Sequence, residues 1–274
     1  MTADLVLAET TDGVRTLTLN NPERRNAWSI AMEERYFGLL EEADRDPSVR
    51  AIVVTGSAEG KTFCPGLDMQ RLSAQSTASD KLDVSARRPQ TFPLRIRKPM
   101  IAAINGACAG VGLMQALNCD VRFAARGAKF TTAYARRGLP AEYGSSWLLP
   151  RLIGVEHALD LLLSGRVVDA DEAKTLGLVS RVTEPADVLT EARAYAADLA
   201  ANCSPRSMAA IRRQVYGDLS RRFDESMAHT LMMMADFSQA PDFTEGVASF
   251  AEKRPAAFPD LDPAFDVPGD HEYR

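Results

Sequence analysis

The N-terminal part of the chain alternates short apolar runs with turn residues, a pattern that predicts strands and helices in succession. Val6–Glu9 and Val14–Leu19 are strand-like runs on either side of Asp12-Gly13, a dipeptide typical of tight hairpin turns. Ser29 then precedes a helical pattern that continues to about Arg45, and its side chain suits an N-cap. We therefore expect a hairpin followed by a long helix.

Apolar runs in the middle of the chain predict buried strands, each followed by a turn. The expected strands are Ala51–Thr55, Ile101–Asn105 and Val121–Ala124. Gly110–Leu117 follows the second of these strands as a helix, and Ser57–Asp68 is expected to be a loop. This repetition of strand, turn and helix is typical of an α/β protein.

The remaining segments are polar or helical in pattern. Gln70–Ser85 is expected to be a mobile helix-loop segment, and Phe92–Arg97 to be the end of a helix. After about Gly144 the pattern is helical, apart from a strand at Leu178–Val182, and from Pro255 an extended tail is expected. The expected helices are Ser145–Ile153, Glu156–Ser164, Asp171–Leu176, Ala186–Asn202, Pro205–Tyr216 and Leu219–Phe237.

The last of these helices carries a continuous apolar stripe. Phe223, Met227, Leu231, Met234 and Phe237 recur at intervals of three and four residues, so their side chains share one helix face. Such a face is expected to lie in the core or at a subunit interface.

Composition narrows the class of protein. The chain has 274 residues, of which 46% are hydrophobic and 25% charged, as in ordinary globular proteins. Its net charge of −5 disfavours nucleic acid as a partner, because such binding relies on a basic surface. The N-terminal segment has no signal-peptide pattern, and the longest apolar stretch, residues 100–117, is interrupted by Asn105 and Gln115. We therefore expect a cytoplasmic protein that does not enter a membrane.

The cysteines and histidines show no metal-binding or disulfide pattern. Cys64, Cys108, Cys119 and Cys203 include no Cys-x-x-Cys pair, which is consistent with free thiols in a reducing cytosol. The three histidines lie far apart in the sequence, and no metal site is expected.

Two glycine-containing segments could bring backbone N–H groups to a ligand. Residues 63–68 follow a predicted strand and contain Pro65-Gly66, while residues 105–112 connect a predicted strand to a predicted helix. Two N–H groups that face one point form an oxyanion hole. The second segment is not a dinucleotide fingerprint, because Leu113-Met114-Gln115 stands where a third glycine is needed. Each segment alone is equally consistent with an ordinary turn.

Taken together with other motifs, these segments resemble the crotonase superfamily, the enoyl-CoA hydratase/isomerase family. The resemblance covers almost the whole chain, and its strength lies in the order and spacing of the motifs. They are, in chain order, Asn21-Pro22 to Asn26-Ala27, Phe63 to Asp68 with Pro65 in place of alanine, Lys98-Pro99 to Gly112, Cys119-Asp120 with Ala124, Leu163 to Val179, and Glu245-Gly246 to Phe258.

The resemblance implies both an architecture and a substrate. The implied fold is α/β, a spiral of β-β-α turns over residues 1–200 that carries the acyl-CoA site, followed by a helical trimerisation region and tail over residues 201–274. The implied assembly is a homotrimer or a hexamer built as a dimer of trimers. In such a fold the N–H groups of Leu67 and Val111 would hold the thioester oxygen, although Val111 replaces the usual glycine.

The chain departs from the family at both of the usual hydratase glutamates. Met114 and Tyr134 occupy those positions, and neither side chain is a suitable base at neutral pH. Glu142 stands where some isomerases and a dehalogenase of the family carry a working aspartate. Its carboxylate is predicted either to be the principal acid/base, with Tyr134 orienting water or substrate, or to cap the helix that begins near Gly144.

Further residues are implied to bind the substrate and its coenzyme A part. They are Arg24, Arg25, Ala27, Cys64, Gly66, Asp68, Met69, Gly110, Met114, Lys253 and Phe258. No tightly bound cofactor is expected, since coenzyme A enters as part of the thioester.

The resemblance predicts an enzyme that forms a thioester enolate, a hydratase or isomerase of fatty-acid or carboxylic-acid catabolism. Two alternatives remain at this stage. One is a crotonase-type hydrolase of a C–C or thioester bond, and the other is a CoA-binding homologue without catalytic activity.

Overall fold

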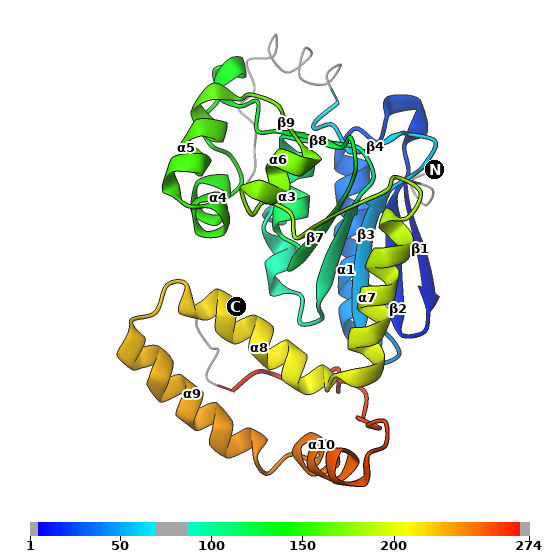
Figure 1. Cartoon of the computed structure of the whole chain (residues 1–274), viewed down its shortest axis with the longest axis vertical. Helices are drawn as coiled ribbons and strands as arrows, with labels where there is room; N and C mark the ends of the chain where they lie inside the picture. The colour runs from blue at the N-terminus through cyan, green and yellow to red at the C-terminus, as the bar shows by residue number, and fades with distance from the viewer. Residues whose placement is uncertain (1–4, 69–86, 269–274) are drawn as a thin grey trace.

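The computed structural model describes residues 5–68 and 87–268, which form two β-sheets and their covering helices (Figure 1). The larger sheet has the order β1-β2-β3-β5-β7-β10. Its strands are β1 (Val6–Thr11), β2 (Val14–Leu19), β3 (Ala51–Gly56), β5 (Met100–Ile104), β7 (Val121–Ala125) and β10 (Arg181–Thr183). β1 and β2 pair antiparallel around Asp12-Gly13, and the other neighbours pair parallel. The predicted hairpin and the three mid-chain strands are confirmed, whereas the strand predicted at Leu178–Val182 lies at Arg181–Thr183.

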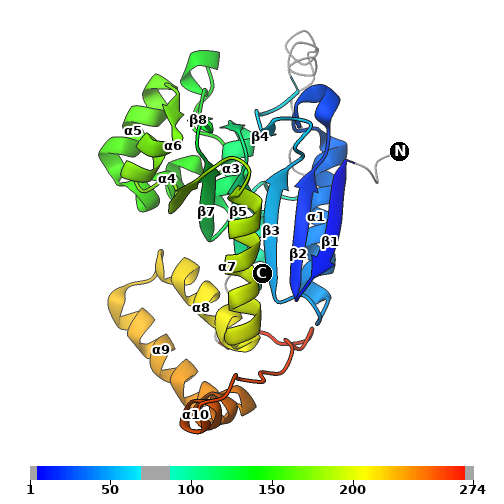
Figure 2. The same ribbon diagram turned by 45° about the vertical axis from the view of Figure 1, so that its right-hand side comes forward.

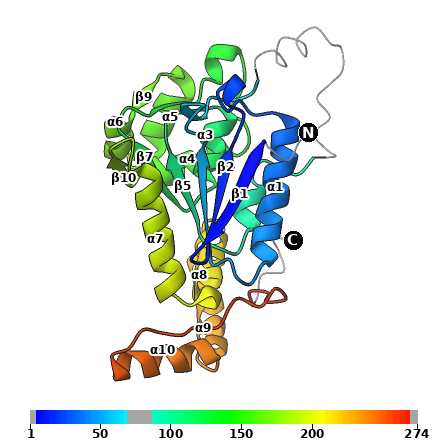
Figure 3. The ribbon, with the colours of Figure 1, turned by 90° about the vertical axis from the view of Figure 1, so that its right-hand side faces the viewer.

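Two helices cover opposite faces of this sheet, as Figure 3 shows. Ile52 and Val54 of β3 pack in the core cluster that contains α1 (Ile30–Arg45), while Val53 packs in the cluster that contains α7 (Val188–Asn202). Every residue of β3 is therefore buried, as expected for a parallel strand covered on both faces. Ser29 caps α1 as predicted, because its hydroxyl accepts a 3.2 Å hydrogen bond from the N–H of Met32.

The smaller sheet was not predicted. It has the order β4-β6-β8-β9, formed by β4 (Thr62–Cys64), β6 (Ala107–Ala109), β8 (Lys129–Thr131) and β9 (Val168–Asp169). The segments expected to be a loop and a turn therefore contain β4 and β6. Strands of two or three residues are too short to show a period of two along the sequence, and they form here by pairing with distant segments.

Helices dominate the second half of the described chain. Besides α1 and α7, the described helices are α3 (Val111–Leu117), α4 (Ser145–Ile153), α5 (Val155–Ser164), α6 (Ala170–Thr175), α8 (Pro205–Asp218), α9 (Phe223–Phe237) and α10 (Pro241–Glu252). The 3-10 turns are η1 (Pro22–Arg24), η2 (Phe92–Arg95) and η3 (Ala135–Arg137). The predicted helices are present, except that α9 begins at Phe223 rather than at Leu219. Phe92–Arg97 contains only a 3-10 turn, and α10 was not predicted. Figure 2 shows α8, α9 and α10 beyond one end of the large sheet.

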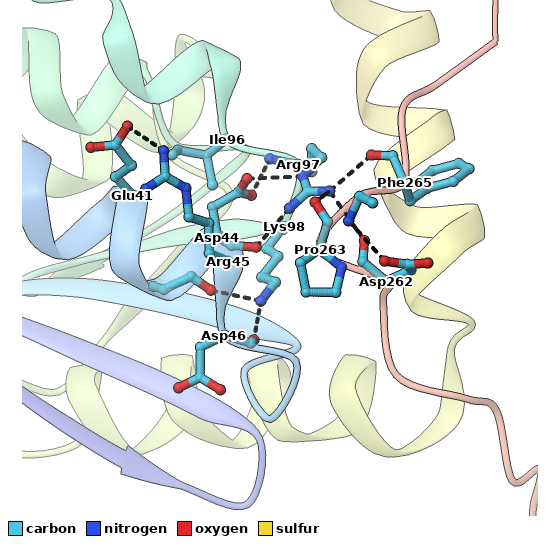
Figure 4. Close-up of polar contacts among 12 residues, drawn as sticks. Glu41, Asp44, Arg45, Asp46, Ile96, Arg97, Lys98, Asp262, Pro263 and Phe265 are labelled. Atoms are coloured by element: carbon cyan, nitrogen blue, oxygen red, sulfur yellow. Dashed lines mark hydrogen bonds and ion pairs between the residues drawn. The ribbon is translucent and has the colours of Figure 1, made fainter.

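The C-terminal tail returns from α10 to that end of the sheet. Residues 255–268 contain neither helix nor strand, as predicted. Two arginines hold them. Arg50 donates to the carbonyl oxygen of Phe258 at 2.8 Å. Arg97 donates to that of Phe265 at 2.8 Å, as Figure 4 shows. Arg97 also pairs with Asp44 at the C-terminal end of α1.

Some expectations concern features that the structure describes only in part. The predicted helix-loop segment Gln70–Ser85 lies outside the described residues. In the parts that are described, every helix is too short or too polar to cross a membrane. The division after residue 200 stays a prediction, although α8, α9 and the tail share a small apolar cluster of their own around Met233.

Candidate active site

A cavity of about 380 Å³ lies between the two glycine-containing segments and the chain that follows β8. Its wall combines backbone amides, apolar side chains and a few charged groups. The lining residues are Arg24, Arg25, Ala27, Pro65, Gly66, Leu67, Asp68, Gly110, Val111, Thr132, Ala133, Tyr134, Arg137, Leu139, Glu142 and Tyr143.

The first segment presents the N–H of Leu67. Trp28 forms a parallel bridge with Leu67: its N–H donates to the carbonyl oxygen of Gly66 at 2.8 Å, and its carbonyl oxygen accepts from the N–H of Asp68 at 3.2 Å. Because N–H groups alternate in direction along an extended backbone, the N–H of Leu67 points away from Trp28. No partner for this N–H is found among residues 5–68 and 87–268.

The second segment presents the N–H of Val111, the first residue of α3. A helix leaves its first N–H groups without intrahelical partners, and that of Val111 has none in the described part of the chain. Gly110 precedes it with φ 51° and ψ −122°, a conformation that favours glycine. A Cβ on Gly110 would lie 3.9 Å from the Cα of Gly66, so the two segments adjoin. Val111 itself is helical and tolerates its side chain.

Glu142 is a half-buried carboxylate on the wall of the cavity. Burial raises its pKa above the usual value of 4.5. The carboxylate does not cap α4, because the N-cap residue is Gly144 and no side-chain cap bond is present there. The role of Glu142 as the principal acid/base stays a prediction, and its place on the cavity wall is consistent with it.

Tyr134 is buried in the same wall. Its hydroxyl donates a long hydrogen bond of 3.5 Å to the carbonyl oxygen of Gly110. Burial raises the pKa of this phenol further above 10, and the negative charge of Glu142 contributes to the rise. Tyr134 is thus a neutral hydrogen-bonding group at neutral pH.

The structure brings most of the predicted site residues to this cavity. Those on its wall are Arg24, Arg25, Ala27, Gly66, Leu67, Asp68, Gly110, Val111, Tyr134 and Glu142. Arg24 also pairs with Asp68 at 3.4 Å, at the exposed rim. Met69 lies outside the described residues.

Four other predicted residues do not line the cavity. Cys64 and Met114 are fully buried in the main core, and burial raises the pKa of the Cys64 thiol to about 12. Lys253 terminates α10, and Phe258 lines a separate groove between α8 and α10. Because β4 and α3 turn the side chains of Cys64 and Met114 into the core, the predicted substrate contact of these two residues finds no support in the cavity and stays a prediction.

Six residues of the wall were not among the predicted site residues, although Pro65 belongs to one of the motifs. They are Pro65, Thr132, Ala133, Arg137, Leu139 and Tyr143. Ala133 and Tyr143 have positive φ values of 58° and 55°, a strain that no sequence pattern reveals. Only the proximity of Tyr143 to Glu142 could have indicated its place. Across the described residues, no group of three His, Cys, Asp or Glu side chains could hold a metal ion.

Comparisons with known proteins converge on one family. The family model described as enoyl-CoA hydratase/isomerase matches residues 9–261. A protein named probable enoyl-CoA hydratase from Rhodobacter capsulatus is 34% identical over 255 residues, which are 91% of this chain and 96% of that protein. The 1,2-epoxyphenylacetyl-CoA isomerase of Escherichia coli is 31% identical over 260 residues, covering 93% of this chain and 98% of that protein. A solved structure of an enoyl-CoA hydratase from Mycobacterium marinum is 48% identical, with a TM-score of 0.68, and the match covers 80% of this chain and all of that one.

Proposed function

The chain belongs to the enoyl-CoA hydratase/isomerase family, and we propose that its cavity binds the thioester of an acyl-CoA and that Glu142 moves a proton on the acyl chain. It is an acyl-CoA-transforming enzyme of the crotonase type, a hydratase or an isomerase, with the crotonase fold predicted from the motifs. One observation carries the proposal: two amides that have no partner in the described part of the chain lie on one cavity with a half-buried carboxylate.

The two amides account for the stabilisation of an enolate. Removal of a proton beside a thioester carbonyl transfers negative charge to the carbonyl oxygen. The N–H groups of Leu67 and Val111 would donate to that oxygen, and fixed donors of this kind need no reorganisation during the reaction. Each such donor contributes about 3 kcal/mol to transition-state stabilisation.

Glu142 accounts for the proton transfer. Its carboxylate would accept a proton from one carbon, so that the C–H electron pair forms the enolate, and would return the proton to another carbon. The raised pKa makes the carboxylate a stronger base than an exposed glutamate, and it increases the fraction that is protonated at a given pH. Tyr134 would orient water or substrate through its neutral hydroxyl.

This set of residues favours isomerisation over hydration. Hydration needs a group that takes a proton from water and a group that delivers one to the α-carbon. Met114 is buried in the core and cannot transfer protons, and Tyr134 stays protonated. A shift of a double bond needs only one group that carries the proton, and Glu142 is sufficient for it.

The test compares Glu142→Gln with the wild type on a panel of acyl-CoA thioesters. Loss of enoyl absorbance reports hydration, migration of the double bond reports isomerisation, and free thiol reports release of CoA. We expect isomerisation to fall about 10²–10⁴-fold in Glu142→Gln, because the variant keeps the shape and removes proton transfer. In the wild type, kcat/KM for isomerisation should decline as the pH falls through a pKa above 4.5, since the base must be ionised.

Glu156→Gln is the control, since Glu156 is an exposed residue of α5 and does not line the cavity. Rapid hydration of crotonyl-CoA that persists in Glu142→Gln would contradict the proposal. Release of free CoA as the main reaction would identify a thioester hydrolase instead.

We also propose that coenzyme A enters only with the substrate and that the enzyme is a homotrimer or hexamer.

A further inference from the structure

A single buried carboxylate connects both sides of the cavity through hydrogen bonds. Glu33 lies in the first turn of α1, and its side chain is only 3% exposed. Its Oε2 accepts from the indole Nε1 of Trp28 at 3.1 Å. Arg87 donates to both oxygens, from Nε at 3.0 Å and from a terminal nitrogen at 2.5 Å, and the side-chain amide of Gln90 donates to Oε2 as well. The carboxylate is therefore fully engaged, although it does not line the cavity.

One arm of this network ends at the first amide. The indole that Glu33 holds belongs to Trp28, whose main chain brackets Leu67 through the carbonyl oxygen of Gly66 and the N–H of Asp68. The direction of the Leu67 N–H thus depends on the placement of Trp28. The ring of Trp28 is fully buried against Tyr36, so it has one packed position.

The other arm ends at the helix that carries the second amide. Gln90 accepts a 2.9 Å hydrogen bond from Gln115 through its side-chain oxygen and a 2.7 Å bond from Asn118 through its main-chain oxygen. Gln115 is a buried residue of α3, the helix that begins at Val111. Glu33 therefore reaches α3 through Gln90.

We propose that Glu33 is a positioning residue that fixes the two amides relative to each other. The proposal rests on the function proposed above, in which both amides hold one oxygen. Oxyanion donors act only when they are preorganised, and an error of about 1 Å in their placement removes much of their effect. A buried carboxylate with donors from separate segments supplies such rigidity, since each donor is directed by a charged acceptor.

The test reads the stabilised enolate directly, by the near-ultraviolet absorbance of acetoacetyl-CoA bound to the purified enzyme. The ratio of bound enolate to bound keto form reports the strength of the oxyanion hole. In Glu33→Gln, we expect this ratio and kcat to fall about tenfold, while KM stays within about twofold, because transition-state contacts are lost and ground-state binding is kept. Trp28→Phe, which keeps the Glu33–Arg87 pair but removes the indole N–H together with part of the buried ring, should change both quantities in the same direction.

Asp44→Asn is the matched control. Asp44 pairs with Arg97 at 2.9 Å near the other end of α1, so its loss weakens the same helix without touching the network. We expect it to lower the melting temperature and to leave the enolate ratio unchanged.

The outcomes separate the two proposals. Absence of enolate absorbance in the wild type would overturn the oxyanion function itself. A normal enolate ratio in Glu33→Gln, or equal losses in Glu33→Gln and Asp44→Asn, would overturn the positioning role only. If Glu33→Gln does not fold, the enolate ratio of Trp28→Phe tests the positioning role instead: a normal ratio in this variant would overturn it.

Discussion

Leu67 and Val111 present their amides to the cavity for different local reasons. Leu67 is extended, and Trp28 holds its neighbours on both sides, so its own N–H points the other way. Val111 begins α3, where helix geometry leaves the N–H without a partner. Neither donor is a side chain, so the residue type matters less at these positions than the backbone path. This explains how a valine can occupy the second position.

A pair of substitutions at Leu67 tests the role of its backbone. Leu67→Ala keeps the N–H and should retain most of the activity, whereas Leu67→Pro removes the donor and should lower kcat about 10²–10³-fold. The measurement is kcat and KM on the acyl-CoA that proves active. Equal turnover in the two variants would contradict the assignment. The absorbance of acetoacetyl-CoA bound to Trp28→Phe provides an independent check on the loop that contains Leu67.

Sequence reasoning identified the chemical groups of the site better than its walls. Leu67 and Val111 lie in two of the motifs, Tyr134 and Glu142 were placed by the family resemblance, and all four line the cavity. Tyr143 could not be found in the same way, because its place depends on a strained backbone (φ 55°) and on packing between distant segments. Cys64 and Met114 were also assigned to the site, although both are buried in the core. A motif indicates which residues lie near a ligand, but it does not give the direction of each side chain.

At the scale of elements, the contact between α3 and β4 sets the place of the second amide. Gly112 lies so close to this strand that an added Cβ would be 2.2 Å from the carbonyl oxygen of Cys64 and 2.6 Å from its Cβ. Backbone atoms cannot rotate away as a side chain can. Any side chain at residue 112 therefore displaces the start of α3, and with it Val111.

Gly112→Ala should consequently destabilise the protein and reduce its activity. Overpacking of this kind costs about 1–3 kcal/mol. Gly38→Ala is the matched helical control: nothing lies within 4 Å of its added Cβ, so it should stabilise α1 by about 0.4–1 kcal/mol. Unfolding in urea measures both effects, and equal midpoints for the two variants would refute this account of the α3–β4 contact.

Elements with strong local signals were predictable, and elements that depend on distant partners were not. Helix α1 has an N-cap at Ser29, and the hairpin has Asp12-Gly13 with both residues at positive φ. Strands such as β9, which has two residues, exist only because β8 pairs with them. Helix α10 was not predicted, and its residues entered the sequence analysis only through the motif Glu245-Gly246 to Phe258.

Lys98 links the end of α1 to the start of β5. The pH dependence of protein stability can test this link, because the link depends on the ammonium group of Lys98. Its ammonium donates to the main-chain carbonyl oxygens of Ala43 and Asp46 (Figure 4). Burial lowers its pKa from the usual 10.5 to about 8, although Asp44 and Asp46 partly oppose the shift. Between these two values the unfolded chain binds more protons than the folded chain, so the contribution of Lys98 to the free energy of unfolding rises with pH.

The expected signature is a pH-dependent difference between the wild type and Lys98→Met. As the pH increases from 7 to 10, the free energy of unfolding of the wild type should increase relative to that of the variant, by up to about 3 kcal/mol. Subtracting the two curves cancels the cysteines and tyrosines, which titrate in both proteins. A difference that stays constant over this range would show that the Lys98 pKa is not lowered.

At the scale of the whole molecule, α9 presents apolar side chains that residues 5–68 and 87–268 leave exposed. Phe223 is 82% exposed, Leu231 62% and Met234 62%, whereas Met233 on the other face is buried with Ala210 and Val267. The apolar stripe of α9 was predicted to lie in the core or at a subunit interface. Because most of its side chains are exposed, they do not lie in the core of the described chain. An exposed patch of this kind marks an interaction surface.

We therefore expect α9 to pack against another copy of the chain. Light scattering at micromolar concentration should give three or six times the chain mass of 29.9 kDa. Phe223→Asp combined with Leu231→Asp should reduce the mass and preserve the circular dichroism spectrum, because both side chains are exposed within one chain and support little of its own packing. Ser238→Asp is the control, a charge just after the end of α9 and outside the stripe. A monomeric mass for the wild type would contradict the expectation, and an unchanged mass for the double variant would place the contact on a different surface.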